Sequence, residues 1–298
     1  DLALFKGLLS ARYRDIPTAL YFHENQLTYP WSPDDADVAE KRDHHYAFIN
    51  YSSALVADGV FFNSDFHRQS FLEELPVLLK QFPDFREERK VLELVKKCQT
   101  LTLGTDLSKF LSPLEEKSQV PTILWNHRWE YDKNPEEFFE LLENLSQKEF
   151  KFNLVVLGAR SNEAPACFER ACQTLESHII HWGSVASPSE YAQWLQRCDI
   201  LPVTGIQDFF GVSVVEGIYA GLYPLLPNRL AYPQHIPAKL QEHYLYQNSE
   251  DLERRLINLL ANWQTTSVDP SLVEHVACYD WTRTIAEYDA EFEKLAKK

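Results

Sequence analysis

The sequence predicts an α/β protein with parallel sheets. Short apolar runs rich in β-branched and aromatic residues alternate with longer amphipathic stretches, and this alternation is typical of βα units. Two of the amphipathic stretches open on Asn134-Pro135 and Ser187-Pro188, where an N-cap residue precedes a proline at the first helical position. A chain of 298 residues is long enough for two such domains, each with its own core.

The elements follow one another in this alternating order. Strands are predicted where short apolar runs are bounded by polar or turn-forming residues: Thr18–His23, Ala54–Asn63, Gln99–Leu103, Pro121–Asn126, Asn153–Leu157, Ile179–Trp182, Ile200–Thr204 and Tyr223–Leu226. Helices are predicted where apolar residues recur at helical spacing: Ala39–Ser53, Asp65–Leu79, Pro135–Ser146, Pro165–Glu176, Pro188–Gln196, Val212–Ala220, Ser249–Asn262 and Trp281–Ala296.

The polar, helix-poor segment Asp106–Gln119 predicts a linker between two domains. We expect a partial N-terminal domain over residues 1–113, a more complete second domain over 114–278, and a C-terminal helix in 279–298 that packs back towards the first. The first portion has too few strands for a full Rossmann-like domain, and the chain opens at Asp1 and contains no Met. We therefore expect either a fragment that lacks an N-terminal strand and glycine-rich turn, or methionines missing from the printed sequence.

Composition restricts the class of protein. Hydrophobic residues make up 45% and charged residues 24%, which is ordinary for a soluble globular chain, and no apolar run approaches the ~20 residues that cross a bilayer. Five cysteines without a Cys-x-x-Cys pair favour reduced thiols in a cytoplasmic protein over disulfides or zinc. The net charge of −15 has the wrong sign for general nucleic-acid binding.

The passage from Asp208 to Glu216 is the most informative one. It holds two carboxylates eight positions apart, a loop that ends in Gly211, and an apolar helix from Val212. Glycine lets a ligand approach the backbone closely, and the first N–H groups of a helix suit a phosphate. The two carboxylates can accept hydrogen bonds from sugar hydroxyls. Together, the loop, the helix start and the carboxylates predict a nucleotide-sugar site. The alternative is a buried strand–turn–helix with two incidental acids.

A second polar cluster, His23-Glu24-Asn25-Gln26, directly follows an apolar strand. Open α/β sheets bind ligands at their strand ends, so these side chains are candidates for a site. No histidine follows at the spacing of a zinc protease, and a solvated turn is the alternative.

Two further clusters follow strands in the second half. Asn126, Arg128 and Lys133 precede a predicted helix, where a planar fork and a compact cation can bind phosphate oxygens. Trp129 is either core or a lid, and core is the safer interpretation. Gly183, after the strand from Ile179, allows a backbone loop to read a nucleobase edge, although this signal is weak.

The spacing of Arg128 and Lys133, then of Asp208 and Glu216, resembles the retaining glycosyltransferases of family 4. That family has the GT-B fold, in which two Rossmann-like domains face a cleft. The strings YFHENQLTYP (21–30) and WNHRWEYDKNP (125–135), with FFG (209–211) and YPLLPN (223–228), more narrowly resemble the tRNA-queuosine α-mannosyltransferases. This resemblance runs over nearly the whole chain, and members of the family carry several dozen residues before the point where this chain begins.

The resemblance implies GDP-mannose as the donor and the cyclopentenediol of queuosine in the anticodon of tRNA(Asp) as the acceptor, with retention of configuration. No metal or other cofactor is expected, because the cations and the helix terminus can carry the phosphate charge. Arg128 and Lys133 would hold the diphosphate, and Asp208 would hold the mannose hydroxyls. The resemblance also implies Glu216 on the ribose, His23 near the donor sugar, and the backbone of Phe209, Phe210 and Gly211 at the donor. From their places after predicted strands or at the start of a predicted helix, we further expect Val212, Glu24, Asn25, Asn126 and Gly183 to contact the donor.

One residue departs from the family pattern, because family 4 enzymes usually carry glutamate where this chain has Asp208. The shorter side chain puts its contact with the sugar in doubt. Alternative functions are a family 4 transferase with another nucleotide-sugar donor and a glycan or lipid acceptor, a sugar-nucleotide epimerase, or a non-catalytic module that binds nucleotide sugars. Because the chain is acidic, we expect the preceding segment and a local strip to supply the positive contacts to tRNA.

Overall fold

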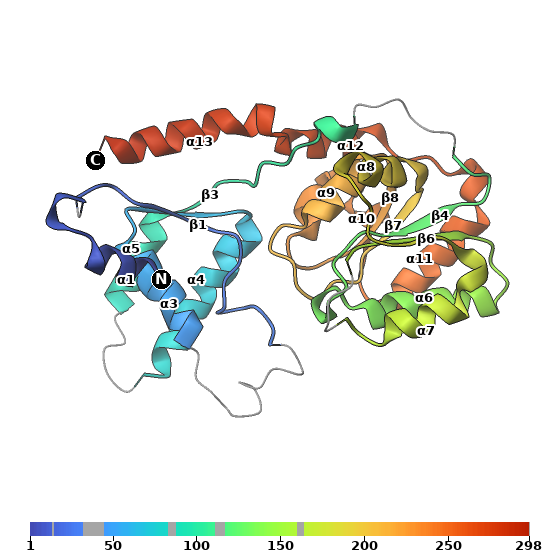
Figure 1. The fold of residues 1–298 in the computed structure, drawn as a ribbon, viewed down its shortest axis with the longest axis horizontal. Coiled ribbons are helices and arrows are strands. Elements are labelled where there is room, and N and C mark those ends of the chain that lie inside the picture. The colour runs from blue at the N-terminus through green and yellow to red at the C-terminus, as the bar shows by residue number, and fades with distance from the viewer. Residues whose placement is uncertain (14, 32–44, 83–87, 111–116, 160–163, 298) are drawn as a thin grey trace. The chain divides into compact units, whose positions relative to one another are not determined.

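The computed structural model describes residues 1–13, 15–31, 45–82, 88–110, 117–159 and 164–297 (Figure 1). The chain divides into two compact units, one made of Asp1–Gly104 with Trp281–Lys298 and the other of Thr105–Asp280. Within the described part of the chain, no helix combines the length and the hydrophobicity that crossing a bilayer requires. Residues 39–44 of the predicted helix Ala39–Ser53 lie outside the described residues.

The first unit contains a three-stranded parallel sheet in the order β1-β2-β3. Its strands are β1 (Ala19–Phe22), β2 (Gly59–Phe62) and β3 (Cys98–Thr100). Its helices are α1 (Leu2–Leu8), α3 (His45–Val56), α4 (Asp65–Lys80), α5 (Glu88–Lys97) and α13 (Trp281–Ala296). The predicted strand Ala54–Asn63 is wrong in its first part, because α3 continues to Val56. The run is apolar across the helix end and the strand start, so its pattern does not separate the two.

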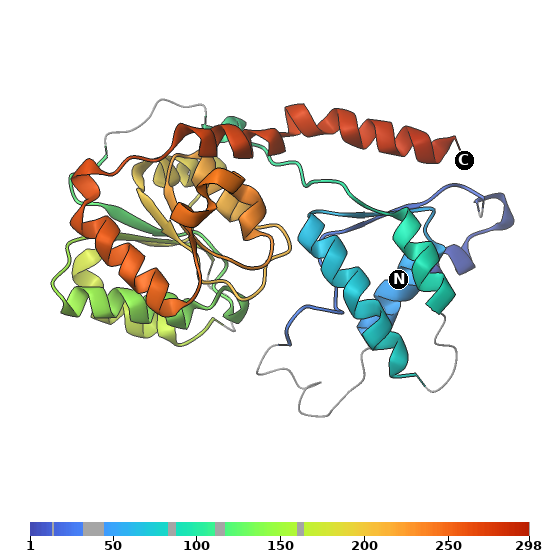
Figure 2. The ribbon, with the colours of Figure 1, turned by 180° about the vertical axis from the view of Figure 1, so that it is seen from behind.

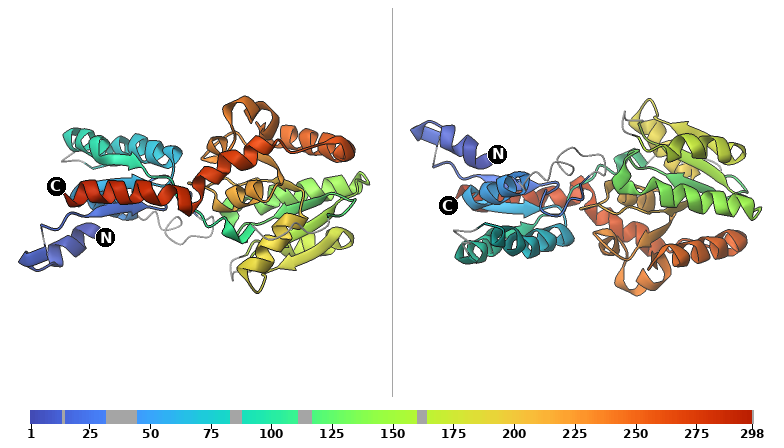
Figure 3. Two further views of the ribbon diagram at one scale, coloured as in Figure 1. Left: turned by 90° about the horizontal axis from the view of Figure 1, so that it is seen from above. Right: turned by 90° about the horizontal axis from the view of Figure 1, so that it is seen from below.

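Both faces of the first sheet are covered. Val60 and Phe62 of β2 pack with buried residues of α3, α4 and α5, whereas Phe61 between them packs with Tyr288 and Leu295 of α13. This alternation follows from the twofold period of a strand. Figure 3 shows α13, in red, lying over the strands of this unit, and Figure 1 shows the other helices on the opposite side of the sheet.

The second unit contains a six-stranded parallel sheet in the order β6-β5-β4-β7-β8-β9. Its strands are β4 (Thr122–Trp125), β5 (Asn153–Leu157), β6 (Ile179–Gly183), β7 (Ile200–Pro202), β8 (Tyr223–Pro227) and β9 (Leu245–Tyr246). Its helices are α6 (Pro135–Gln147), α7 (Cys167–Thr174), α8 (Pro188–Arg197), α9 (Val212–Tyr219), α10 (Gln241–Tyr244), α11 (Ser249–Ala261) and α12 (Pro270–Val276).

Strands β4 and β7 are neighbours in the middle of this sheet. From β4 the chain builds outwards through β5 to β6, and from β7 it builds the other way through β8 to β9. The strand order therefore reverses between β4 and β7. Open α/β sheets bind ligands outside the carboxyl ends of the strands at such a reversal, so this edge is the expected place for a site.

Helices cover both faces of the second sheet (Figure 2). Buried residues of α6, α7 and α11 form one continuous cluster with alternate residues of the strands, including Ile123, Leu154 and Ile200. Helices α9 and α12 pack against each other on the opposite side, where Val215, Ile218 and Leu272 are fully buried. Because both faces are covered, a central strand such as β5 reads as an unbroken apolar run.

Candidate active site

The loops after β4 and β7 bring Lys133 and Asp208 together. The ammonium of Lys133 lies 3.3 Å from Asp208 Oδ2 and 3.2 Å from Asp132 Oδ2, and it donates a 2.9 Å hydrogen bond to the Gln207 carbonyl. Lys133 is 9% exposed. The hydroxyl of Tyr232 also lies 3.3 Å from Asp208 Oδ2 and donates to it. A cation and a carboxylate that are distant in sequence are thus held side by side.

Local geometry explains how Lys133 reaches this place. A 3-10 turn at Tyr131–Lys133 is followed by Asn134 in the left-handed region (φ 52°), and α6 begins at Pro135. The hydroxyl of Thr204, just beyond β7, lies 3.0 Å from the Lys133 carbonyl and 2.9 Å from the Asn134 carbonyl. These contacts tie the end of the β4 loop to the β7 loop, and they fix the backbone at Lys133.

Gly211 places the start of α9 at the same edge. It is the N-cap residue, with φ +87°, a backbone conformation that favours glycine. The side chains of Phe209 and Phe210 are buried, which leaves only their backbone available to a ligand. His235 holds the loop, because its Nε2 lies 2.6 Å from the Phe210 carbonyl. Burial lowers the pKa of His235 to about 4, so the ring stays neutral and donates this bond.

Glu216, one turn into α9, is 7% exposed. Its Oε2 accepts a 2.8 Å hydrogen bond from the Tyr191 hydroxyl, and its Oε1 forms an ion pair with Lys109. Burial and the neighbouring carboxylate raise the pKa of Tyr191, so the phenol remains a donor. The amide of Asn126 donates to the Ser213 carbonyl at 2.8 Å and lies 3.3 Å from the Tyr191 hydroxyl. Asn126 and Glu216 therefore belong to one hydrogen-bonded group.

A pocket of about 560 Å³ opens beside this group. Asn126, His127 and Arg128 line it after β4, Gly158 after β5, Ser184 after β6, and Tyr191 from α8. The side chain of Arg128 is 65% exposed and forms a 3.0 Å ion pair with Glu130, which also lines the pocket. The pocket thus joins the carboxyl ends of three adjacent strands to the residues around Glu216.

Gly183 ends β6 with φ +118°, and its carbonyl accepts a 3.2 Å hydrogen bond from the Gly158 amide. A methyl group at Gly183 would meet nothing within 4 Å among the described residues. Its neighbours Ser184 and Val185 line the pocket. The backbone after β6 therefore borders the pocket at the position where the sequence predicts a nucleobase contact.

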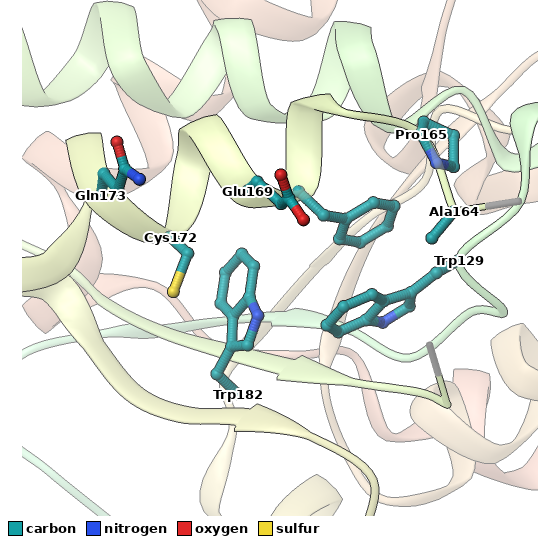
Figure 4. A pocket seen from close by; sticks show the side chains of 8 residues that line it. Trp129, Ala164, Pro165, Glu169, Cys172, Gln173 and Trp182 are labelled. Carbon is teal, nitrogen blue, oxygen red and sulfur yellow. The ribbon is translucent and has the colours of Figure 1, made fainter. Parts of the chain in front are cut away.

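A second pocket has a volume of about 400 Å³ and is lined by Trp129, whereas its neighbours Arg128 and Glu130 line the first pocket. Trp129 and Trp182 line it below the helix that carries Glu169 and Cys172, as Figure 4 shows. Trp129 is 5% exposed and stacks on Phe168 with ring centroids 4.3 Å apart. Trp129 is therefore a core residue, as the sequence suggested, and it anchors the strand-end loop whose neighbours line the first pocket.

The His23 cluster belongs to the first unit, directly after β1. His23 and Glu24 are exposed, whereas Asn25 is fully buried. The Asn25 side-chain oxygen accepts hydrogen bonds from the Leu27 and Thr28 amides at 2.9 and 3.1 Å. Asn25 thus shapes the turn that presents His23 and Glu24.

Sequence reasoning missed four residues of this site. Lys109 lies in a segment expected to be only a linker, Tyr191 lies within a helix and Tyr232 in a 3-10 turn, and none of these three stands in a recognisable motif. His127 stands inside the motif of residues 125–135, but its sequence position alone predicts no role for it. Its 4% exposure directly after a central strand is a structural signal that only the fold reveals.

Comparisons with known proteins agree with the resemblance in the sequence. Residues 1–105 match the family described as tRNA-queuosine alpha-mannosyltransferase N-terminal, and residues 109–268 match that described as glycosyl transferases group 1. A tRNA-queuosine alpha-mannosyltransferase of Drosophila melanogaster is 34% identical over 250 residues, which are 80% of this chain and 63% of that protein. The resemblance is confirmed, and the chain spans less than two thirds of this curated relative.

Solved structures confirm the GT-B fold class. Sucrose-phosphate synthase from Thermosynechococcus elongatus superposes with a TM-score of 0.69 at 15% identity, over 93% of this chain and 67% of that one. Anabaena HepE in complex with UDP and glucose superposes with a TM-score of 0.64 at 13% identity, over 95% of this chain and 72% of that one. At this identity the likeness concerns the fold alone.

Proposed function

The chain belongs to the glycosyl transferases of group 1, and on that premise we propose that it is a retaining mannosyltransferase. The proposed donor is GDP-mannose, and the proposed acceptor is the cyclopentenediol of queuosine in the anticodon of tRNA(Asp). The match of residues 1–105 and the 34% identity to the Drosophila mannosyltransferase support this choice of substrates. A glycan or lipid acceptor, or binding without catalysis, are the alternatives that the test below separates.

The observation that carries the proposal is the contact of Lys133 with Asp208 beside the first turn of α9. Departure of a nucleoside diphosphate leaves negative charge on the phosphate and positive charge on the sugar ring. In our proposal, Lys133, Arg128 and the α9 N-terminus stabilise the departing phosphate, while Asp208 binds the mannose hydroxyls. These charges suit both halves of the breaking bond, as transition-state stabilisation requires.

The remaining residues bind and orient. We assign Glu216 to the ribose hydroxyls, and Asn126 with the backbone near Gly183 to the nucleoside. The amides from Phe209 to Val212 would bind the donor, and we assign His23 with Glu24 to the transfer step. No carboxylate is assigned as a nucleophile, so we favour attack by the acceptor on the same face from which GDP leaves. The cations and the helix terminus can neutralise the diphosphate without a metal.

The test incubates the purified protein with GDP-mannose and tRNA that contains queuosine, followed by digestion to nucleosides and mass measurement. We expect a mannosylated queuosine nucleoside whose glycosidic bond is cleaved by an α-mannosidase. The matched control is the same tRNA with guanosine in place of queuosine, which should accept no sugar. Binding of GDP-mannose without transfer or release of mannose would indicate a binding module, and transfer to lipid or glycan alone would overturn the acceptor.

A further inference from the structure

His127 is a buried histidine that lines the 560 Å³ pocket. It directly follows β4 and is 4% exposed. The Trp125 indole donates a 3.0 Å hydrogen bond to its carbonyl. Gly158 directly follows β5, and a Cβ there would stand 2.6 Å from the same carbonyl, so this position requires glycine. The Trp125 hydrogen bond therefore fixes the His127 carbonyl, and the backbone after β5 packs closely against it.

The two ring nitrogens of His127 have different surroundings. Nδ1 lies 2.9 Å from the hydroxyl of Ser213, the second residue of α9. Nε2 is buried and has no hydrogen-bond partner among the residues that the structure describes. The adjacent Asn126 likewise has a buried side-chain oxygen with no partner in the same described set. A buried polar group without a partner costs stability, so two of them lining one pocket indicate that the pocket binds a polar ligand.

The charge of the ring follows from its surroundings. Burial, helped by the Lys133 cation, lowers the pKa of His127 to about 3, so the imidazole is neutral at physiological pH. A neutral imidazole carries one N–H, and the hydrogen bond at one nitrogen decides which nitrogen holds it. When the Ser213 hydroxyl donates to Nδ1, the ring proton resides on Nε2. The Nε2–H group is then a hydrogen-bond donor that has no partner among the described residues.

The surroundings favour an anionic ligand for that donor. Ser213 belongs to the first turn of α9, where unpaired N–H groups and the helix dipole attract phosphate. Lys133 is close enough to influence the ring electrostatically. Phosphate oxygens only accept hydrogen bonds, so they match an N–H and not a bare ring nitrogen.

Building on the proposed function, we propose that His127 Nε2–H donates a hydrogen bond to a phosphate oxygen of the bound nucleoside diphosphate. Ser213 acts as the positioning residue that sets the tautomer. His127 is thus a donor-binding residue, and its contribution depends on the phosphates and is independent of the base.

The experiment compares the affinities of GDP and guanosine by calorimetry for the wild type and three variants. His127→Asn removes the donor at the Nε2 position, and we expect GDP to bind about tenfold to a hundredfold more weakly with guanosine unchanged. His127→Gln places an amide N–H near the Nε2 position and should restore most of the GDP affinity. Ser213→Ala should weaken GDP binding a few-fold. The matched control is His243→Gln, at an exposed histidine of α10, which should bind GDP as the wild type does.

Each outcome decides whether His127 binds a phosphate oxygen of the nucleoside diphosphate. Equal losses for GDP and guanosine in His127→Asn would show a structural role and overturn the inference, as would unchanged GDP binding. If His127→Asn does not fold, the GDP-to-guanosine ratio of Ser213→Ala against wild type decides in its place. If the wild type transfers mannose but the His127 and Ser213 variants bind GDP as tightly as the wild type, the inference is overturned and the proposed function stands. Wild type that binds neither GDP, UDP nor ADP would overturn both.

Discussion

Lys133 shows how single residues are prepared for chemistry in this fold. Its ammonium is held by Asp132, Asp208 and the Gln207 carbonyl. A charge that is already in place costs no reorganisation when the phosphate departs, which is the usual source of electrostatic catalysis. Arg128 differs, because its guanidinium is exposed and forms an ion pair with Glu130 at the edge of the pocket.

We predict that Lys133→Met and Arg128→Met each lower kcat about a hundredfold, equivalent to ~3 kcal/mol of lost transition-state stabilisation. Lys133→Met should also lower the free energy of unfolding, because it leaves Asp132 and Asp208 without their cation. Arg128→Met should leave stability unchanged, since its side chain is exposed. Steady-state kinetics and chemical denaturation measure the two effects. Lys148→Met, at an exposed ion pair with Glu253, is the control. Near-normal turnover in both site variants would contradict the phosphate assignment.

At this scale the sequence revealed residues whose neighbours in the chain form a pattern. Asp208, Gly211 and Glu216 could be recognised together because a loop and a helix turn set their spacing. The partners of these residues, Lys109 on Glu216 and Tyr232 on Asp208, come from other parts of the chain. Contacts of this kind depend on packing, and a single sequence carries no local signal for them.

At the scale of elements, α9 connects the site to the core. Its inner residues Val214, Val215 and Ile218 are fully buried, while Ser213 in its first turn contacts Asn126 and His127 of the loop after β4. Gly211 at its N-terminus and Gly221 after its C-terminus have nearly the same positive φ, +87° and +89°. The helix therefore offers two positions with the same backbone requirement, of which only the first borders the proposed phosphate site.

We predict that Gly211→Ala and Gly221→Ala each lower the free energy of unfolding by about 1–2 kcal/mol, because alanine is strained at positive φ. A Cβ at Gly211 would be 3.6 Å from Asp208 Oδ2, an ordinary contact, so the cost arises from the backbone. Only Gly211→Ala should also raise the KM for the donor. Denaturation curves and kinetics of both variants test this, and an equal change in KM would argue against a role for the α9 N-terminus.

Helices and strands could be predicted where the pattern of apolar residues along the chain is clear. β5 at Asn153–Leu157 and α13 at Trp281–Ala296 match their predicted bounds, because one is an unbroken apolar run and the other a long amphipathic stretch. α5 (Glu88–Lys97) was missed, since its dense charges resemble a solvated loop. β9, with two residues, is too short to give any pattern.

At the scale of the whole molecule, the α/β class follows from alternation along the chain and is confirmed. The order of strands within a sheet does not follow in the same way. That β4 and β7 are neighbours, and that the strand order reverses between them, depends on long-range pairing such as Ile123 with Ile200. This reversal brings the Lys133 loop and the Asp208 loop together. The two residues could be predicted from the sequence, whereas their contact could not, because it depends on the strand order.

Buried neutral histidines give the molecule a predictable response to acid. Burial lowers the pKa of His127 to about 3 and that of His235 to about 4, both in the second unit, and that of His67 to about 3 in the first. In the unfolded chain these rings take up a proton near pH 6.5. Between pH 6.5 and about 4 the unfolded state thus binds more protons than the folded state, and stability falls as pH falls.

We predict that the free energy of unfolding decreases between pH 7 and pH 5, by up to about 1.4 kcal/mol per buried histidine for each pH unit below 6.5. Urea denaturation at several pH values measures this slope, before the carboxylates begin to titrate. His67→Asn should reduce the slope, because it removes one ring that gains a proton on unfolding, whereas His243→Gln at an exposed position should leave it unchanged. A stability that stays constant between pH 7 and pH 5 would mean that these rings are already charged in the folded protein. His127 could then not serve as the neutral donor to phosphate.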